Sequence, residues 1–176
     1  MKKTTFLIIL PLLCAFLFMN MKCKKEPQID PDGLPKATQT GAMIFACKIN
    51  GENWISKKSV YSLGGSIEND LIAVHGVNDS NESRGFERLD IQLDKVSSVM
   101  LYKLDDPSGR FATYTTSSKC FDVVEGIGRA KSSAGEVYLT RIDRASRIIS
   151  GTFWCDISTE KCGVIKITDG RFDIRY

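Results

Sequence analysis

The chain has 176 residues, a formal net charge of +3, one histidine and six cysteines. Lys2, Lys3 and Lys22 lie in the first 22 residues, where there is no acidic residue; of the 24 lysines and arginines, 21 therefore remain against 21 acidic residues. Because nucleic-acid binding needs surplus positive charge to displace counterions from phosphates, this balance argues against nucleic acid as a partner. The length after residue 22 suits one domain of ordinary size.

The first 23 residues have the anatomy of an export signal. Lys2 and Lys3 precede an uninterrupted apolar run over residues 6–19, and Cys23 follows closely. A helix needs about 20 apolar residues to span a bilayer, so this shorter run fits the apolar region of a signal peptide. Two alternatives are an uncleaved membrane anchor and an ordinary secretory signal. The ordinary cut needs small residues before the site, and residues 20–22 (Asn-Met-Lys) are not small.

The segment resembles bacterial lipoprotein signals of the relaxed Bacteroidetes type, in which Cys-Lys-Lys follows the apolar run. Here that motif is Cys23-Lys24-Lys25. The usual signal has Leu three residues before the cysteine and a small residue just before it, whereas this chain has Asn20 and Lys22.

The resemblance implies a signal peptide over residues 1–22 and a lipid anchor on Cys23, carrying palmitate-type acyl chains. Several acyl chains on one cysteine give stable anchoring where one chain is marginal. Lys24, in place of Asp, favours the cell outer membrane by the sorting rule of such lipoproteins. The periplasmic and surface faces of that membrane both remain open.

Residues 23–41 are predicted to be the lipidated cysteine and a proline-rich tether. Pro27, Pro31 and Pro35 fall in a stretch with almost no apolar residues, which is typical of a solvated spacer. The sequence Asp-Pro-Asp-Gly at residues 30–33 has too few ligands for a calcium loop, and we interpret it as a turn.

From residue 42 to 176 the pattern predicts a single all-β domain. Phe45, Cys47 and Ile49 alternate with more polar positions, and Asn50-Gly51 is a strong hairpin signal. Strands are expected at residues 43–49, 53–56, 60–67, 71–77, 86–94, 99–104, 111–116, 120–124, 136–142, 147–157 and 163–176. No segment shows helical spacing over ten or more residues. The prediction is an antiparallel β-sandwich or β-barrel of about eight to ten strands with little helix.

Irregularities are expected at several places in this pattern. Gly64-Gly65 suggests a bulge or a bend, and a change of parity at Asp169-Gly170 suggests a bulge or a tight turn. Residues 78–85 are interpreted as a polar loop, and residues 126–135 as a small, flexible segment.

The domain resembles small Bacteroidetes outer-membrane lipoproteins built around an uncharacterised all-β domain of unknown function. The resembling motifs are Phe45-x-Cys47-x-Ile49-Asn50-Gly51-x-x-Trp54, Ile149-Ser150-Gly151-Thr152-Phe153 and Ile167-Thr168-Asp169-Gly170-Arg171-Phe172-Asp173. The resemblance implies an all-β fold at the cell envelope. It implies no activity and no catalytic residues.

Four cysteines belong to the domain, and an exported protein with four can form two disulfides. The spacing favours Cys155 with Cys162 across a hairpin, leaving Cys47 with Cys120. Other connectivities and buried thiols are alternatives. No two cysteines have zinc-ligand spacing and there is one histidine, so no metal site is predicted.

The sequence supplies no catalytic constellation, and we expect no enzyme activity and no cofactor. His75 is the one candidate base, and it lies mid-strand without a nucleophile motif. Asp90, Asp94, Asp105 and Asp106 could pair for glycoside cleavage, but their alternation with Leu and Ile fits a solvated strand face better.

Aromatic residues are the remaining candidates for a ligand site. They could line a sugar or apolar-ligand site, or belong to the core: Trp54, Trp154, Tyr61, Tyr102, Tyr114 and Tyr138. The function expected is a non-catalytic envelope lipoprotein, a binding or interaction module tethered by Cys23. The alternatives are a lipocalin-like carrier of a small apolar ligand, a carbohydrate-binding module and, less favoured, an enzyme of unrecognised type. The partner beyond the membrane, whether protein, glycan or small apolar ligand, is left open.

Overall fold

The computed structural model describes residues 28–57, 61–81, 85–104, 106–117, 128–159 and 161–176. The expected signal peptide, the lipidation site Cys23 and the expected strand at residues 120–124 lie outside these ranges. Within them the helical segment is the single 3-10 turn Asp106–Ser108, so no helix is long and apolar enough to cross a membrane.

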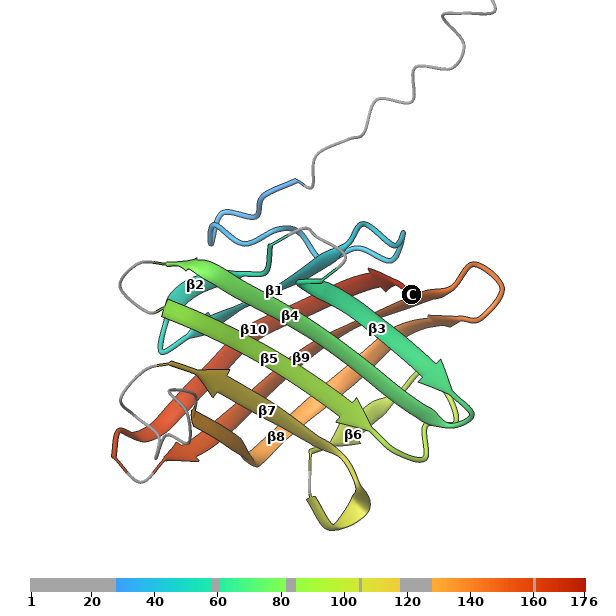
Figure 1. The fold of residues 1–176 in the computed structure, drawn as a ribbon. Coiled ribbons are helices and arrows are strands. Elements are labelled where there is room, and N and C mark those ends of the chain that lie inside the picture. The colour runs from blue at the N-terminus through green and yellow to red at the C-terminus, as the bar shows by residue number, and fades with distance from the viewer. Residues whose placement is uncertain (1–27, 58–60, 82–84, 105, 118–127, 160) are drawn as a thin grey trace, which may run out of the picture.

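The described residues form one ten-stranded antiparallel sheet (Figure 1). Its strands are β1 (Ile44–Ile49), β2 (Glu52–Ile55), β3 (Leu63–Glu68), β4 (Leu71–Asn81), β5 (Gly85–Leu93), β6 (Leu101–Lys103), β7 (Phe111–Thr116), β8 (Gly128–Asp143), β9 (Ile148–Thr159) and β10 (Gly163–Arg175). The all-β prediction is confirmed. The sequence did not distinguish a sandwich from a barrel. The observed architecture is a half-barrel, in which a single antiparallel sheet curls on itself.

The strand order is β2-β1-β10-β9-β8-β7-β5-β4-β3, with β6 paired to β8 on the side. The sheet curls so that β3, β4 and β5 lie across β10 and β9 (Figure 1). The two layers thereby enclose a common interior, and the long strands β8 and β9 each have an outer face that points away from it.

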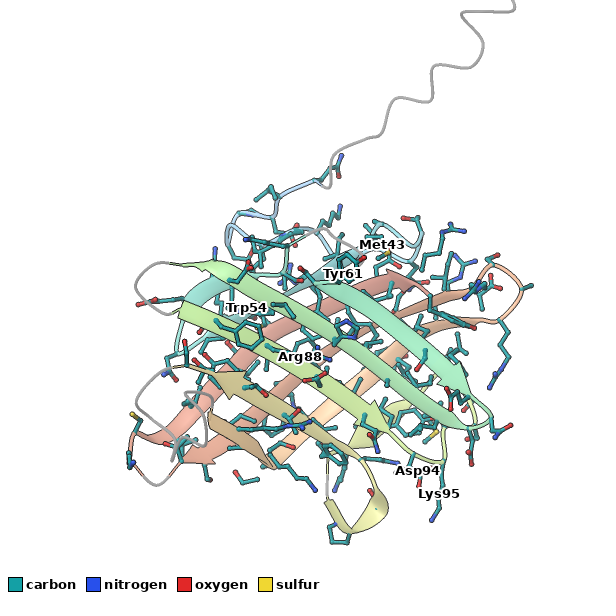
Figure 2. The ribbon with its side chains drawn as sticks, in the orientation of Figure 1. Met43, Trp54, Tyr61, Arg88, Asp94 and Lys95 are labelled. Atoms are coloured by element: carbon teal, nitrogen blue, oxygen red, sulfur yellow. The ribbon has the colours of Figure 1, made fainter. Side chains whose placement is uncertain are left out.

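Alternating apolar side chains fill the interior between the two layers (Figure 2). Phe45 lies at its centre, with ring centroids 5.3 Å from Phe153, 6.3 Å from Phe172 and 6.0 Å from Trp54. These four side chains are at most 5% exposed. Packing of this kind leaves the interior as a solid core of tilted and edge-on aromatic rings.

Two of the expected irregularities are confirmed. Asn50 and Gly51 both have positive φ, 51° and 85°, as a two-residue hairpin with the twist of the strands requires. The register between β9 and β10 shifts between Ile167 and Gly170, where Asp169 has φ 53°. This bulge returns Phe172 and Ile174 to the interior.

The bulge expected at Gly64-Gly65 is wrong, because β3 pairs with β4 without a break from Leu63 to Glu68. A Cβ on Gly65 would lie 3.0 Å from the carbonyl oxygen of Ala73, on the neighbouring strand. These glycines therefore permit close packing of the strands.

The flexible segment expected at residues 126–135 is likewise wrong for its described part. Residues 128–135 belong to β8. A Cβ on Gly135 would lie 2.7 Å from both the Trp154 carbonyl oxygen and Cys155 Cβ, so small residues here reflect tight strand packing.

The expected cysteine pairing is wrong. Cys47 and Cys155 are both buried thiols, so Cys155 is not joined to Cys162, nor Cys47 to Cys120. Cys120 itself lies outside the described residues. No disulfide joins two cysteines within the part of the chain that the structure describes. Both thiols point into the core from β1 and β9, a common position for an inert cysteine.

Residues 28–41, which we call the arm, lie against the domain, so the solvated spacer expected over residues 23–41 is wrong for this part. Leu34 is fully buried in a small apolar cluster with Ile44 and Ala46, on the face of β1 opposite the main core. An isolated bridge between Ile29 and Pro35 shapes the turn around it. Leu34 is thus the apolar contact by which this proline-rich stretch packs on the domain.

Candidate binding groove

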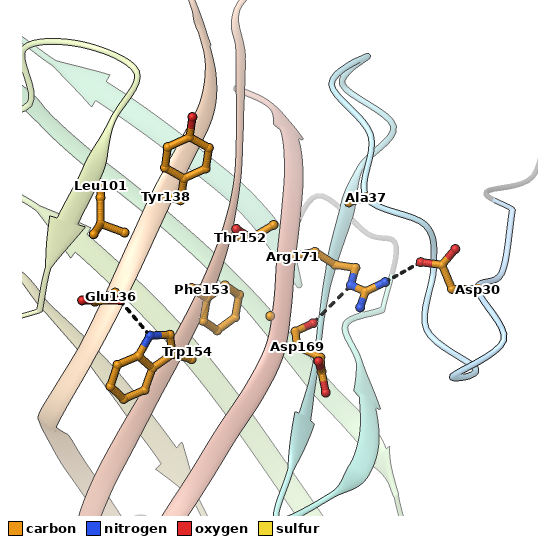
Figure 3. Close-up of a pocket in the computed structure, with 11 residues that line it drawn as sticks. Asp30, Ala37, Leu101, Glu136, Tyr138, Thr152, Phe153, Trp154, Asp169 and Arg171 are labelled. Carbon is orange, nitrogen blue, oxygen red and sulfur yellow. Dashed lines mark hydrogen bonds and ion pairs between the residues drawn. The ribbon is translucent and has the colours of Figure 1, made fainter.

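A groove of about 530 Å³ lies on the outer face of the sheet, between the arm and strands β8, β9 and β10 (Figure 3). Its size falls in the range of small-molecule sites. It is lined by Asp30 and Ala37 of the arm, Leu101, Glu136, Tyr138, Thr152, Phe153, Trp154, Asp169, Gly170 and Arg171.

Strand alternation and register bring these residues together. Tyr138 on β8 is paired with Leu101 of β6 on one side and with Thr152 of β9 on the other, and Thr152 is paired with Arg171 of β10. These four residues form one row across the outer face. A second row places Glu136 opposite Trp154.

The wall formed by β6, β8 and β9 is aromatic and exposed. Tyr138 is 48% exposed, Trp154 41% and Leu101 46%, although each is a large apolar side chain. The Trp154 indole Nε1–H donates a hydrogen bond to Oε2 of Glu136 at 3.1 Å, which fixes the orientation of the ring (Figure 3). The result is a rigid aromatic surface open to solvent.

The opposite wall is charged and is organised by Arg171, whose side chain is 12% exposed. Its guanidinium donates to the carboxylates of Asp30 (2.8 Å) and Asp32 (3.2 Å) and to the carbonyl oxygens of Pro35 (3.2 Å) and Asp169 (3.1 Å). Arg171 therefore joins the arm to β10 and holds this wall in place. The carboxylate of Asp32 also accepts a hydrogen bond from Leu34 N–H. This hydrogen bond, together with the nearby cations Arg171 and Lys48, lowers the pKa of Asp32 below its usual value.

The floor depends on Gly170 in the β10 bulge. A Cβ on Gly170 would lie 2.6 Å from the ring of Phe153, so any larger residue would clash with the core. Without a side chain at this position, the groove extends down to the edge of Phe153. The bulge therefore deepens the groove as well as correcting the register.

The groove has the chemistry of a binding site. It offers an apolar surface with a few fixed hydrogen-bonding groups, the usual composition of ligand pockets. Among the described residues there is no cluster of three or more histidine, cysteine or acidic side chains that could hold a metal ion.

The six aromatic candidates separate into three groups. Trp54, Tyr102 and Tyr114 are buried in the core, and Tyr61 is 88% exposed and does not line the groove. Trp154 and Tyr138 come together in the groove. The sequence pattern alone could not separate these roles. Which side chains of β8 face inward depends on register shifts at residues 132–134 and 139–141, and the sequence does not mark these shifts.

The sequence did not single out Glu136, Asp169, Asp30 or Arg171. Glu136 and Tyr138, two residues apart, share the outer face of β8, and Thr152 and Trp154 share that of β9. The pair of outward-facing aromatic residues on adjacent strands, Tyr138 and Trp154, was the sequence feature that could have indicated the groove. The contribution of the arm was missed, because its proline-rich composition is typical of a spacer.

Among the described residues, His75 lies on β4 and Asp90 on β5, and Asp94 directly follows β5. His75 is half-buried and lies opposite Asp90 in the pairing of β4 with β5. Desolvation and the nearby Arg88 lower the pKa of His75 despite the carboxylate of Asp90. Asp90 is engaged by Arg88 through bonds of 2.5 to 2.9 Å, and Asp94 accepts from Lys95 N–H at 2.9 Å. Asp105 lies outside the described residues, as does the side chain of Asp106.

Comparison with protein-family models, with curated proteins and with solved structures finds no match for this chain.

Proposed function

We propose that the protein is a non-catalytic cell-envelope lipoprotein of the Bacteroidetes type, anchored in the outer membrane through Cys23, that binds an envelope ligand in the groove. The observation that carries this proposal is the groove itself, where exposed Trp154 and Tyr138 lie beside fixed polar groups. Soluble proteins seldom leave clustered large apolar side chains in water without a binding role.

The filled interior supports a surface binding module over a lipocalin-like carrier. A carrier needs a cavity within its barrel, lined by side chains that face inward. Here the inward positions are packed against one another, with Phe45, Phe153 and Phe172 at the centre. The exposed aromatic surface is instead on the outside of the curled sheet.

The anchor is tested by membrane fractionation of cells that express Cys23→Ser. The variant lacks the thiol that would be acylated, so we expect it to lose palmitate labelling and to leave the membrane fraction. Cys14→Ser is the matched control, because Cys14 lies in the apolar run of the expected signal and its loss should leave labelling unchanged. Palmitate labelling that persists in Cys23→Ser contradicts the lipoprotein proposal.

The groove is tested by co-sedimentation of the detergent-purified full chain with cell-envelope fragments of the parent bacterium. Trp154→Ala removes the largest part of the exposed surface, and we expect it to reduce the bound fraction about tenfold. Tyr61→Ala is the control, since Tyr61 is more exposed than Trp154 but lies outside the groove. Equal binding by wild type and Trp154→Ala would exclude the groove as the binding site.

For the cysteines we propose a single disulfide between Cys120 and Cys162. Cys47 and Cys155 are buried thiols, which leaves these two as the remaining pair in the domain. In support, Cys162 is exposed and has an interaction partner. An oxidising location outside the cytoplasm favours such a bridge.

A further inference from the structure

We propose that the ligand of the groove is a neutral saccharide, with the apolar faces of its pyranose rings stacked on Trp154 and Tyr138. This inference rests on the proposed function and specifies the ligand class of the same site. It follows from three features of the groove: the placement of the aromatic rings, the type of polar groups beside them, and the sign of the charge that is left for a ligand.

The two aromatic side chains are placed to stack on successive units of a chain. They lie on the outer faces of adjacent strands, and since Tyr138 is paired with Thr152 and Glu136 with Trp154, they are diagonal neighbours. Diagonal positions in an antiparallel pair are about 7–8 Å apart, close enough for two large side chains to form one surface. A pyranose ring presents a flat face of C–H groups that an aromatic ring can cover, with its hydroxyls directed outward from the edge.

The polar groups beside the rings suit hydroxyls. Glu136 uses Oε2 to accept from the Trp154 indole, and no donor among the described residues reaches its Oε1. The Thr152 hydroxyl lies in the same row as Tyr138. The carboxylate of Asp169 lies on the facing side, where its Oδ2 already contacts Lys48 (3.2 Å) and Thr168 Oγ1 (3.3 Å), so its Oδ1 is the acceptor left for a ligand. Carboxylates accept hydrogen bonds from several hydroxyls at once. A purely apolar ligand would remove water from these polar groups and offer no hydrogen bonds in its place, which would weaken its binding considerably.

The charge of the groove disfavours anionic ligands. Its cation, Arg171, already donates to two carboxylates and two carbonyl oxygens. The other charged groups of the lining are the carboxylates of Asp30, Glu136 and Asp169. Asp30 is paired with Arg171 and Asp169 with Lys48 (3.2 Å), so the uncompensated charge is that of Glu136. A phosphate, sulfate or uronic acid would meet net negative charge without an available guanidinium. This observation favours a neutral sugar over a nucleotide, whose base could also stack on Trp154.

The first experiment titrates the full chain with defined oligosaccharides. The protein is purified in a detergent without a sugar headgroup and is followed by tryptophan fluorescence and calorimetry. The probes are cellohexaose, xylohexaose, mannohexaose and maltohexaose, whose 1→4-linked units all carry vicinal diols. We expect saturable binding of at least one, with a change in Trp154 emission while buried Trp54 serves as an internal reference.

Variants then locate the binding. Trp154→Ala and Tyr138→Ala should each weaken the affinity about tenfold or more, in line with the loss of one stacked ring. Tyr61→Ala should bind as wild type does. Absence of binding to all four probes, or binding that Trp154→Ala leaves unchanged, would overturn the saccharide proposal.

A second experiment separates this proposal from the more general one. Envelope fragments are treated either with periodate, which cleaves the vicinal diols of sugars, or with proteinase K, before the co-sedimentation described above. A saccharide ligand predicts that periodate abolishes Trp154-dependent binding and that the protease does not. The reverse pattern would refute the saccharide and leave the groove as a protein-binding site. Absence of Trp154-dependent binding to untreated fragments would refute both proposals.

Discussion

A single buried carboxylate, that of Asp173 on β10, holds the end of the arm that leads into β1. Asp173 is 1% exposed. It accepts hydrogen bonds from Thr38 Oγ1 (2.6 Å), Thr40 N (2.9 Å), Gly41 N (2.9 Å), Ala42 N (3.0 Å) and Ser150 Oγ (2.7 Å). Burial alone would raise the pKa of Asp173, but these donors favour the ionised form and lower its pKa overall.

We expect Asp173→Asn to lower the free energy of unfolding by about 2–4 kcal/mol, because an amide offers one acceptor oxygen and brings two donors of its own into a site made of donors. The measurement is chemical denaturation at neutral pH. Asp156→Asn is a suitable control, because Asp156 lies on β9 away from the arm, and its substitution should change stability by less than about 0.5 kcal/mol. Equal effects of the two variants would contradict this role of Asp173.

The same carboxylate predicts a pH dependence. Since its pKa is lower in the folded protein than the unfolded value of about 3.9, its contribution is fully present well above that value and is lost as the pH falls through the folded-state pKa. The wild type should therefore lose stability in acid more steeply than Asp173→Asn, which cannot bind this proton. Parallel stability curves below about pH 4 would show that Asp173 does not contribute.

At the scale of elements, the arm is the part that the sequence described least well. Proline content predicts a solvated spacer, and Leu34 was too isolated to indicate a core. The alternation in β1 was informative and its consequence was missed: Ile44 and Ala46 are apolar on the second face, and that face is buried only because the arm covers it. A strand that is apolar on both faces needs a covering element on each side.

Releasing the arm should therefore open the groove without unfolding the sheet. We expect Arg171→Gln to expose the bond after Lys36 to trypsin, because it removes the cation paired with Asp30 and the nearer of the two cations paired with Asp32. Cleavage is followed by mass spectrometry under native conditions. Lys166→Gln is the control, since Lys166 is exposed on the same strand but lies outside the groove lining. Unchanged protection of Lys36 in Arg171→Gln would mean that other contacts hold the arm.

The sequence predicted strands better than it predicted their arrangement. The alternation of Leu89, Ile91 and Leu93 with polar residues defined β5, and Asn50-Gly51 defined the first hairpin, because both signals are local. The curl of the sheet depends on pairing between distant strands, such as β1 with β10, and on bulges that the sequence marks only weakly. The groove combines residues from β8, β9, β10 and the arm, so only the aromatic residues could be nominated in advance.

At the scale of the whole molecule, the covalent structure can be checked by mass. With one disulfide, the mature domain should be about 2 Da lighter without reductant than when fully reduced, because each bridge removes two hydrogens. Alkylation of the unfolded, non-reduced protein should modify Cys47 and Cys155, and tryptic peptides should show Cys120 joined to Cys162. A difference of about 4 Da would mean that a second bridge forms.

Native alkylation adds an independent check on the same thiols. Burial, with the nearby Asp156, raises the pKa of Cys155 to about 12, so its thiolate is scarce at neutral pH. We therefore expect modification of Cys155 only after unfolding.

Docking of the arm also shortens the tether between the proposed anchor at Cys23 and the domain. If Cys23 is acylated as proposed, five residue steps separate the anchor from Gln28, and a fully extended chain covers at most about 18 Å over them. A chain unattached up to residue 42 would cover at most about 68 Å over its 19 steps. In the proposed lipoprotein, the domain would therefore lie close to the bilayer surface. Because the arm is also a wall of the groove, the binding site stays at that height, and polymers that run along the membrane surface fall within its reach.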